Sequence, residues 1–153
     1  MKNILFAILT LLAGCSNNRS VKIYLIPKGY EGPLLLIEDP KSIEKLNVNG
    51  DTTIFDFRNS SVLRFKGKFI EGTYPLSNFK YYYIDNAGNR TEIPIALTQI
   101  SKTDPKNYVY LRFTQIGESS QCDLISTSKS LVLNLSKQES LCDSLLSKYP
   151  TYP

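Results

Sequence analysis

The residues that could do chemistry in this sequence are carboxylates and tyrosines, because no histidine is present. Without histidine, Ser-His-Asp and Cys-His catalysis, histidine general bases and histidine-ligated metal sites are excluded. A glycosidase would need two carboxyl groups within about 5–10 Å of each other. The acids that could supply such a pair are Glu31, Asp56, Glu71, Asp85 and Glu92. Sequence cannot bring two of them together, so we expect no catalytic residue, cofactor or metal, with a carboxylate-dependent cell-wall hydrolase as the less favoured alternative.

Tyrosine is abundant, with ten residues, and could form a surface on which a ligand stacks. Tyr81 and Tyr83 fall on one face of an expected strand, and Tyr82 falls on the other. If exposed, the first two could stack on a sugar or a peptide, and Tyr30 could add to the same surface. We favour the alternative, in which these rings pack across neighbouring strands. The three tyrosines therefore define a speculative ligand- or glycan-binding surface.

The first fourteen residues, MKNILFAILTLLAG, have the pattern of a signal peptide. Lys2 gives a positive start, an apolar run follows from Ile4 to Leu12, and Ala13 and Gly14 supply a small-residue cleavage site. The apolar run is shorter than the roughly 20 residues that a transmembrane helix needs. The sequence therefore predicts an export signal over residues 1–14.

Leu12-Ala13-Gly14-Cys15 resembles the lipobox of bacterial lipoproteins. The resemblance implies cleavage between Gly14 and Cys15 and attachment of a diacylglycerol to the Cys15 thiol. Two or more acyl chains anchor a protein stably, because each buried CH₂ contributes about 0.8 kcal/mol. An ordinary secretory cleavage, with Cys15 left as a thiol, is the alternative. Ser16, which is not aspartate, resembles the sorting signal of outer-membrane cargo, so we expect a lipid-anchored envelope protein in the outer membrane.

The mature chain divides into a tether and one domain. Residues 15–20 form the lipidated cysteine and a short polar tether, and residues 21–153 form one β-rich domain of ordinary single-domain length. The net charge of +4 falls to +3 when Lys2 is removed, which is too mild to indicate nucleic acid. We therefore expect the bilayer as one partner, through Cys15, and an unknown envelope protein or glycan as another.

Once Cys15 is assigned to lipid, Cys122 and Cys142 are the two cysteines that remain. An even remainder in an exported chain predicts one disulfide between them. Two unpaired buried thiols are the alternative, since cysteine also packs as a small hydrophobe.

The segment Ile26-Pro27-Lys28-Gly29-Tyr30-Glu31-Gly32-Pro33 is the most distinctive in the mature chain. It resembles a motif, I-P-x-G-[YF]-x-G before an apolar strand, found in small secreted bacterial proteins of uncharacterised function. The resemblance implies a β-rich domain and carries no known chemistry. The prolines fix φ and the glycines allow positive φ, which favours a shaped hairpin connection over a ligand-contacting loop.

Two further segments have both a functional and a plain interpretation. Asp85 to Asn89 has oxygen-bearing side chains beside a glycine but lacks the acids of a calcium loop, which favours a turn. A basic run could meet anionic lipid or a cell-wall polymer, although a solvated face is favoured. That run consists of Arg58, Arg64, Lys66 and Lys68.

Alternation and β-rich composition predict strands over 21–26, 34–37, 53–57, 62–65, 79–85, 90–95, 108–114 and 131–135. In the first strand, Val21, Ile23 and Leu25 share one face, and Lys22, Tyr24 and Ile26 share the other.

The C-terminal segment differs from the strands before it. Ser136 to Glu139 matches a capping box, and apolar residues including Cys142 follow at helical spacing, which predicts a helix over about 137–148. Turn signals about every 8–12 residues, without strand–helix alternation, predict a mainly β protein. The expected architecture is a single small antiparallel β-sandwich, or a barrel-like domain, with a short C-terminal α-helix and an N-terminal signal helix. Its expected function is that of a non-catalytic binding or structural module on a membrane.

Overall fold

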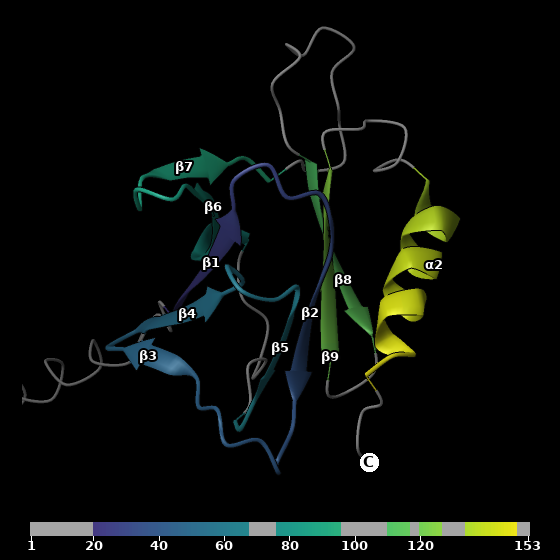
Figure 1. The fold of residues 1–153 in the computed structure, drawn as a ribbon, viewed down its shortest axis with the longest axis horizontal. Helices are drawn as coiled ribbons and strands as arrows, with labels where there is room; N and C mark the ends of the chain where they lie inside the picture. The colour runs from purple at the N-terminus through teal and green to yellow at the C-terminus, as the bar shows by residue number, and fades with distance from the viewer. Residues whose placement is uncertain (1–19, 68–75, 96–109, 117–119, 127–133, 150–153) are drawn as a thin grey trace, which may run out of the picture.

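The computed structural model describes residues 20–67, 76–95, 110–116, 120–126 and 134–149 (Figure 1). Within these residues the chain forms nine strands, a 3-10 helix and one α-helix. They are β1 (Val21–Pro27), β2 (Gly32–Glu38), β3 (Asn47–Asn49), β4 (Thr52–Asp56), β5 (Val62–Phe65), η1 (Leu76–Asn78), β6 (Phe79–Ile84), β7 (Arg90–Ile93), β8 (Tyr110–Ile116), β9 (Ser120–Ser126) and α2 (Leu135–Leu146). The expected mainly β sandwich with a short C-terminal helix is confirmed.

The molecule has three layers. Sheet A has the strand order β3-β4-β1-β6-β7, and sheet B has the order β5-β2-β9-β8. Apolar side chains from both sheets share one buried cluster, and a second cluster lies between sheet B and α2. Sheet B is therefore the middle layer, covered by sheet A on one face and by α2 on the other (Figure 1).

Both sheets are mixed, and the expectation of purely antiparallel pairing is wrong. β1 pairs in parallel with both β4 and β6, and β2 pairs in parallel with β5. Parallel neighbours need a long crossover between them, which is most often a helix. Here a strand of the facing sheet serves as the crossover, because the chain visits β2 between β1 and β4 and visits β5 between β4 and β6. A sequence without strand–helix alternation can therefore still build parallel pairs.

The continuous apolar run in β2 is explained by burial on both faces. Leu34 and Leu36 contribute to the cluster between the sheets, and Leu35 and Ile37 contribute to the cluster under α2. All four side chains are at most 1% exposed. This position at the centre of the middle layer leaves no solvent-facing side, so the period-2 pattern of a surface strand is absent.

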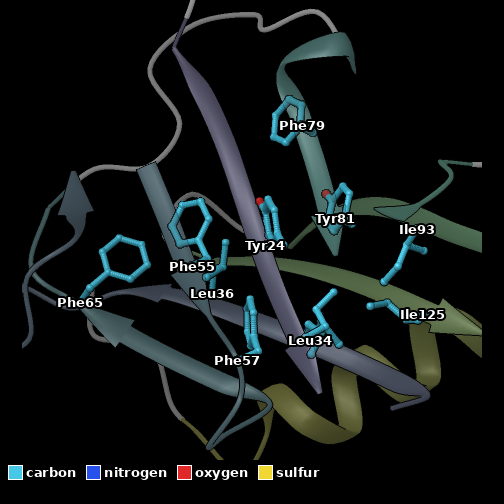
Figure 2. Close-up of a cluster of buried hydrophobic side chains, with 11 residues drawn as sticks. Tyr24, Leu34, Leu36, Phe55, Phe57, Phe65, Phe79, Tyr81, Ile93 and Ile125 are labelled. Atoms are coloured by element: carbon cyan, nitrogen blue, oxygen red, sulfur yellow. The ribbon is translucent and has the colours of Figure 1, made fainter. Parts of the chain in front are cut away.

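The face of β1 that points into the sandwich is the one with Lys22, Tyr24 and Ile26. All three are buried, and Tyr24 is at the centre of an aromatic group between the sheets (Figure 2). Its ring centroid lies 4.9 Å from that of Phe55 and 4.3 Å from that of Tyr81. Aromatic pairs at such distances add stability beyond their buried area.

Strands β3 and β9 were not expected from the sequence. β3 is three residues long and exposed throughout, so burial leaves no pattern in it. β9 is buried at every position, although its sequence SQCDLIS contains four polar residues. The expected strand over 131–135 is contradicted at Leu135, which begins α2, and its residues 131–133 lie outside the described part of the chain.

Helix α2 begins and ends two residues before the expected range. Asn134 is the N-cap, because its side chain accepts a hydrogen bond of 3.0 Å from the backbone N–H of Lys137. An asparagine cap with an extended backbone satisfies a free N–H group of the first turn as well as the expected Ser136 would. The helix packs its apolar face, including Cys142, on sheet B. Cys122 of β9 and Cys142 form a disulfide, with their Cα atoms 6.1 Å apart.

Candidate functional site

The segment from Pro27 to Gly32 connects the two sheets and is not the hairpin connection that the sequence favoured. β1 belongs to sheet A and β2 to sheet B, so this segment crosses from one layer to the next. The hydroxyl of Tyr30 donates a 2.6 Å hydrogen bond to the carbonyl of Pro33. Gly32 has a φ of +134°, and a Cβ there would lie 3.2 Å from the Tyr30 hydroxyl oxygen. Glycine is therefore required under the tyrosine ring, and the motif residues shape the crossing.

Tyr30 and Tyr83 lie together at this end of the sandwich. The Tyr83 hydroxyl donates a 2.9 Å hydrogen bond to the backbone carbonyl of Tyr30, and both side chains are half-buried against the core. Burial raises the pKa of both phenols, and the Glu31 charge adds to this effect for Tyr83. Two members of the expected tyrosine surface are thus neighbours.

Tyr81 does not belong to that surface, and its inclusion was wrong. Its side chain is 1% exposed, because the face of β6 that carries Tyr81 and Tyr83 points toward sheet B. The sequence correctly placed these two tyrosines on one face of a strand. On that face, Tyr81 lies inside the core and Tyr83 lies at the edge of the core.

Tyr81 instead belongs to a group of polar side chains sealed between the sheets, which we call the interior polar cluster. Its members are Tyr24 of β1, Tyr81 of β6, and Gln121 and Asp123 of β9, each at most 1% exposed. The Gln121 Nε2 atom donates to Tyr24 Oη at 3.1 Å and to Asp123 Oδ1 at 2.9 Å. The Tyr81 hydroxyl donates to Asp123 Oδ2 at 3.3 Å. The cluster therefore links β1 and β6 of sheet A to β9 of sheet B.

The electrostatics of this cluster centre on Asp123. Burial raises the pKa of its carboxyl group to about 7, although hydrogen bonds from Gln121 and Tyr81 act in the opposite direction. Burial, followed by the Asp123 charge, raises the pKa of Tyr24 and of Tyr81 well above the usual value. Both phenols therefore stay protonated, and Asp123 is the member that titrates near neutral pH.

A carboxyl group with this pKa has the proton affinity of a general acid or base. Asp123 is nevertheless 1% exposed, and its hydrogen-bond partners are as deeply buried. A substrate would have to separate the two sheets to reach it. The arrangement therefore couples protonation to sheet packing.

The sequence did not identify this cluster. Gln121 and Asp123 alternate with Cys122 and Leu124, which resembles a strand with a solvated polar face. The sequence pattern gives Asp123 no reason to be counted among the candidate catalytic acids. The sequence signal that could have indicated the cluster is Tyr24, which lies on the same strand face as Ile26. A buried tyrosine needs a polar partner for its hydroxyl group.

Among the acids that the sequence offers for a catalytic pair, Asp56 and Asp85 have local structural roles. Arg58 forms a bidentate ion pair with Asp56, which lowers the pKa of that carboxyl. Asp85 accepts hydrogen bonds from the side chain and backbone of Asn89, so residues 85–89 form the expected turn. Glu92 borders a surface hollow over β6 and β7, and Glu71 lies outside the described residues.

Several absences can be stated for the described ranges alone. They contain no group of three or more acidic or cysteine side chains placed to hold a metal ion. No helix among them is both long enough and apolar enough to span a bilayer. Gly14 and Cys15 lie outside these ranges, so the expected cleavage and lipid site stays a prediction. Lys68 of the expected basic run also lies outside them.

The fold and the interior polar cluster define a class of protein. It is a two-sheet β-sandwich with one disulfide-linked helix on sheet B, in which the Asp123 carboxyl group is closed off from solvent. The model of a family described as "Family of unknown function (DUF6843)" matches residues 18–132, which include the two sheets. The match covers three quarters of the chain, so the protein belongs to this family.

A solved structure shares the fold. It is a crystal structure at 2.75 Å described as a "Putative Lipoprotein from Bacillus anthracis". The TM-score is 0.51 at 19% sequence identity, and the alignment covers 85% of this chain and 96% of that one. No curated protein matches the sequence.

Proposed function

We propose that this protein is a lipid-anchored lipoprotein of the bacterial cell envelope whose β-sandwich is a non-catalytic binding or structural module. The observation that carries the proposal is the disulfide between Cys122 and Cys142. Structural disulfides form and persist in oxidising compartments outside the cytoplasm. This supports export independently of the signal peptide and lipobox over residues 1–15.

The anchor is proposed at Cys15, after cleavage behind Gly14. Only five residues separate Cys15 from Val21, the first residue of β1, so the domain would sit close to the bilayer. The description of the Bacillus anthracis protein as a lipoprotein is in keeping with this assignment. Ser16 leads us to propose the outer membrane in a cell that has two membranes.

A non-catalytic role is favoured by the state of the titratable groups. Asp123 is enclosed between the sheets, and Asp56 and Asp85 are occupied by Arg58 and by a turn. A module of this kind would act by binding an envelope protein or glycan. For a glycan, the candidate surface is the half-buried pair Tyr30 and Tyr83, which the hydrogen bond between them orients.

The anchor is tested by labelling cells with a palmitate analogue and fractionating their membranes. Cys15→Ser should lose the label and leave the membrane fraction, because no thiol remains at the lipobox. Cys122→Ser, which removes a cysteine elsewhere, is the matched control and should keep the label. Membrane retention of unlabelled Cys15→Ser protein would contradict the proposal. Ser16→Asp tests the choice of membrane and should shift the labelled protein to the inner membrane.

The tyrosine surface is tested by binding of peptidoglycan fragments to the acylated protein. Tyr83→Ala should weaken binding if the pair stacks on a sugar, and Tyr82→Ala on the opposite face of β6 is the control. Equal binding by both variants would exclude the tyrosine surface as the glycan site and leave the anchor proposal unaffected.

A further inference from the structure

We propose that the loop from Asp39 to Leu46 rests on the membrane surface, with the side chain of Ile43 entering the headgroup region. The inference rests on the proposed lipid anchor at Cys15. It concerns a surface at the edge of the sandwich, where the chain leaves β2 of sheet B and enters β3 of sheet A.

Ile43 is 96% exposed on a loop that is hydrogen-bonded to the end of β5 on both sides of it. The Ser42 hydroxyl donates to the backbone carbonyl of Arg64 at 3.2 Å, and the backbone N–H of Lys66 donates to the carbonyl of Glu44 at 2.7 Å. Single exposed apolar residues are common on protein surfaces. Ile43 is nearly completely exposed, and the hydrogen bonds between its loop and the end of β5 hold the side chain in this outward position.

The start of the loop is also fixed. The side chain of Asp39 is buried, forms an ion pair with Arg64 at 3.3 Å, and accepts a 2.9 Å hydrogen bond from the backbone N–H of Lys41. At the other end, Leu46 turns inward and packs against the core between the sheets. Of the two large aliphatic side chains in the loop, one is therefore used for packing and the other is displayed.

The tether keeps the start of β1, and with it edge strand β3, within reach of the bilayer. The six Cα–Cα steps from Cys15 to Val21 span at most about 22 Å when extended. In sheet A, Lys22 lies opposite Thr53 and Thr53 lies opposite Val48. Two inter-strand spacings place Val48 about 10 Å from the start of β1. Val48 is 58% exposed and lies on edge strand β3, which directly follows the loop.

The charges around Ile43 suit a bilayer that contains anionic lipid. Lys41 and Lys45 lie two residues before and after Ile43, and Lys66 lies beside Lys45 in an isolated β-bridge. Glu44, next to Ile43 in the sequence, is the acid that offsets part of this positive charge. Segments that lie in the membrane interface combine apolar side chains, which enter it, with lysine or arginine, which attracts anionic lipid. A lysine near an anionic surface contributes about fivefold to partitioning. The paired Arg58 and Arg64 of the basic run expected from the sequence are not needed for this contact.

The test uses tryptophan fluorescence, because the chain contains no tryptophan. Acylated full-length Ile43→Trp protein is reconstituted into vesicles of phosphatidylcholine with phosphatidylglycerol, and its N-terminal peptide is analysed by mass spectrometry for acyl groups. Ser140→Trp, at an exposed position on α2, is the matched control. We expect a blue-shifted emission and quenching by brominated lipids for Ile43→Trp alone. Adding Lys41→Glu and Lys45→Glu should reduce that quenching.

The outcomes separate the inference from the anchor proposal. If both variants are acylated and vesicle-bound but neither emission shifts, the loop does not touch the membrane and the inference is overturned while the anchor stands. An equal shift in both variants would also overturn it, because the contact would not be specific to the loop. If mass spectrometry finds no acyl group on Cys15, the anchor proposal itself fails and the inference falls with it. If the emission shifts only when an envelope protein is added, the surface binds protein and the membrane assignment is wrong.

Discussion

Replacing Asp123 by asparagine should remove a specific pH dependence of stability. The folded state raises the pKa of this carboxyl group from its usual 3.8 to about 7 through burial. A carboxyl whose pKa is raised on folding contributes stability that is complete below its unfolded pKa and is lost as pH rises through the folded pKa. The interval corresponds to about 4 kcal/mol, since each pKa unit is worth about 1.4 kcal/mol. We therefore expect this group to lower the free energy of unfolding by about 4 kcal/mol between pH 4 and 7.5.

Asparagine has the shape of the protonated acid and cannot ionise. At pH 4, Asp123→Asn should differ from the natural protein by about 1 kcal/mol, the value of an altered hydrogen bond. At pH 7.5 it should be the more stable protein by several kcal/mol. The pH range of the comparison stops at 7.5 because burial lowers the pKa of Lys22 to about 8, so at higher pH the titration of that amine would add to the pH dependence.

The assay is urea unfolding of the mature protein in detergent, without reductant, at half-unit pH steps. The control is Asp85→Asn, whose carboxyl group is exposed and has its pKa lowered by hydrogen bonds from Asn89. Its stability contribution is present above the unfolded pKa and is lost as pH falls, so this variant should keep the decline caused by Asp123. Parallel pH curves for Asp123→Asn and the natural protein would refute the assignment of that decline to the interior polar cluster.

Three further substitutions test the fold. Cys122→Ser should cost about 3 kcal/mol in urea unfolding, because the disulfide closes a loop of 20 positions; equal midpoints with and without reductant in the natural protein would contradict this. Gly32→Ala should cost about 1–3 kcal/mol through its positive φ and the Tyr30 hydroxyl at 3.2 Å, and should exceed Gly29→Ala, whose positive φ faces open space. Leu35→Ala, at a fully buried position under α2, should lower the free energy of unfolding by about 2–5 kcal/mol, and a loss below 1 kcal/mol would place it outside the core.

Local chemistry made most strands of this fold predictable. The runs 21–26, 34–37 and 62–65 correspond to β1, β2 and β5 within a few residues. The first and third are rich in β-branched and aromatic residues, the second is a short continuous apolar run, and turn residues bound them. The parallel pairings could not be predicted in the same way. They depend on which sheet each strand joins, and that choice is made by contacts between residues distant in the sequence.

The interior polar cluster shows the limit more sharply. Alternation identifies two faces of a strand but does not say which of them points into the sandwich. In β1 the inward face carries Lys22 and Tyr24, while the opposite face carries the aliphatic residues that the pattern alone would bury. In β9 the inward face carries Gln121 and Asp123. For β9, sheet A and α2 cover both faces of the strand, so hydrophobicity does not indicate which face points into the sandwich.

The two faces of β9 together determine its register. Asp123 is held toward sheet A by Tyr81, and Gln121 by Tyr24. Cys122 is held toward α2 by its disulfide to Cys142. A slip of one residue against β2 would turn the carboxyl group under the helix and the thiol into the sandwich. Because the two constraints act on opposite faces, one register satisfies both. We infer that Asp123 is a source of specificity whose cost in stability grows as pH rises from its unfolded pKa toward its folded pKa of about 7. Asparagine, which has the shape of the protonated acid, should remove this cost without changing the register.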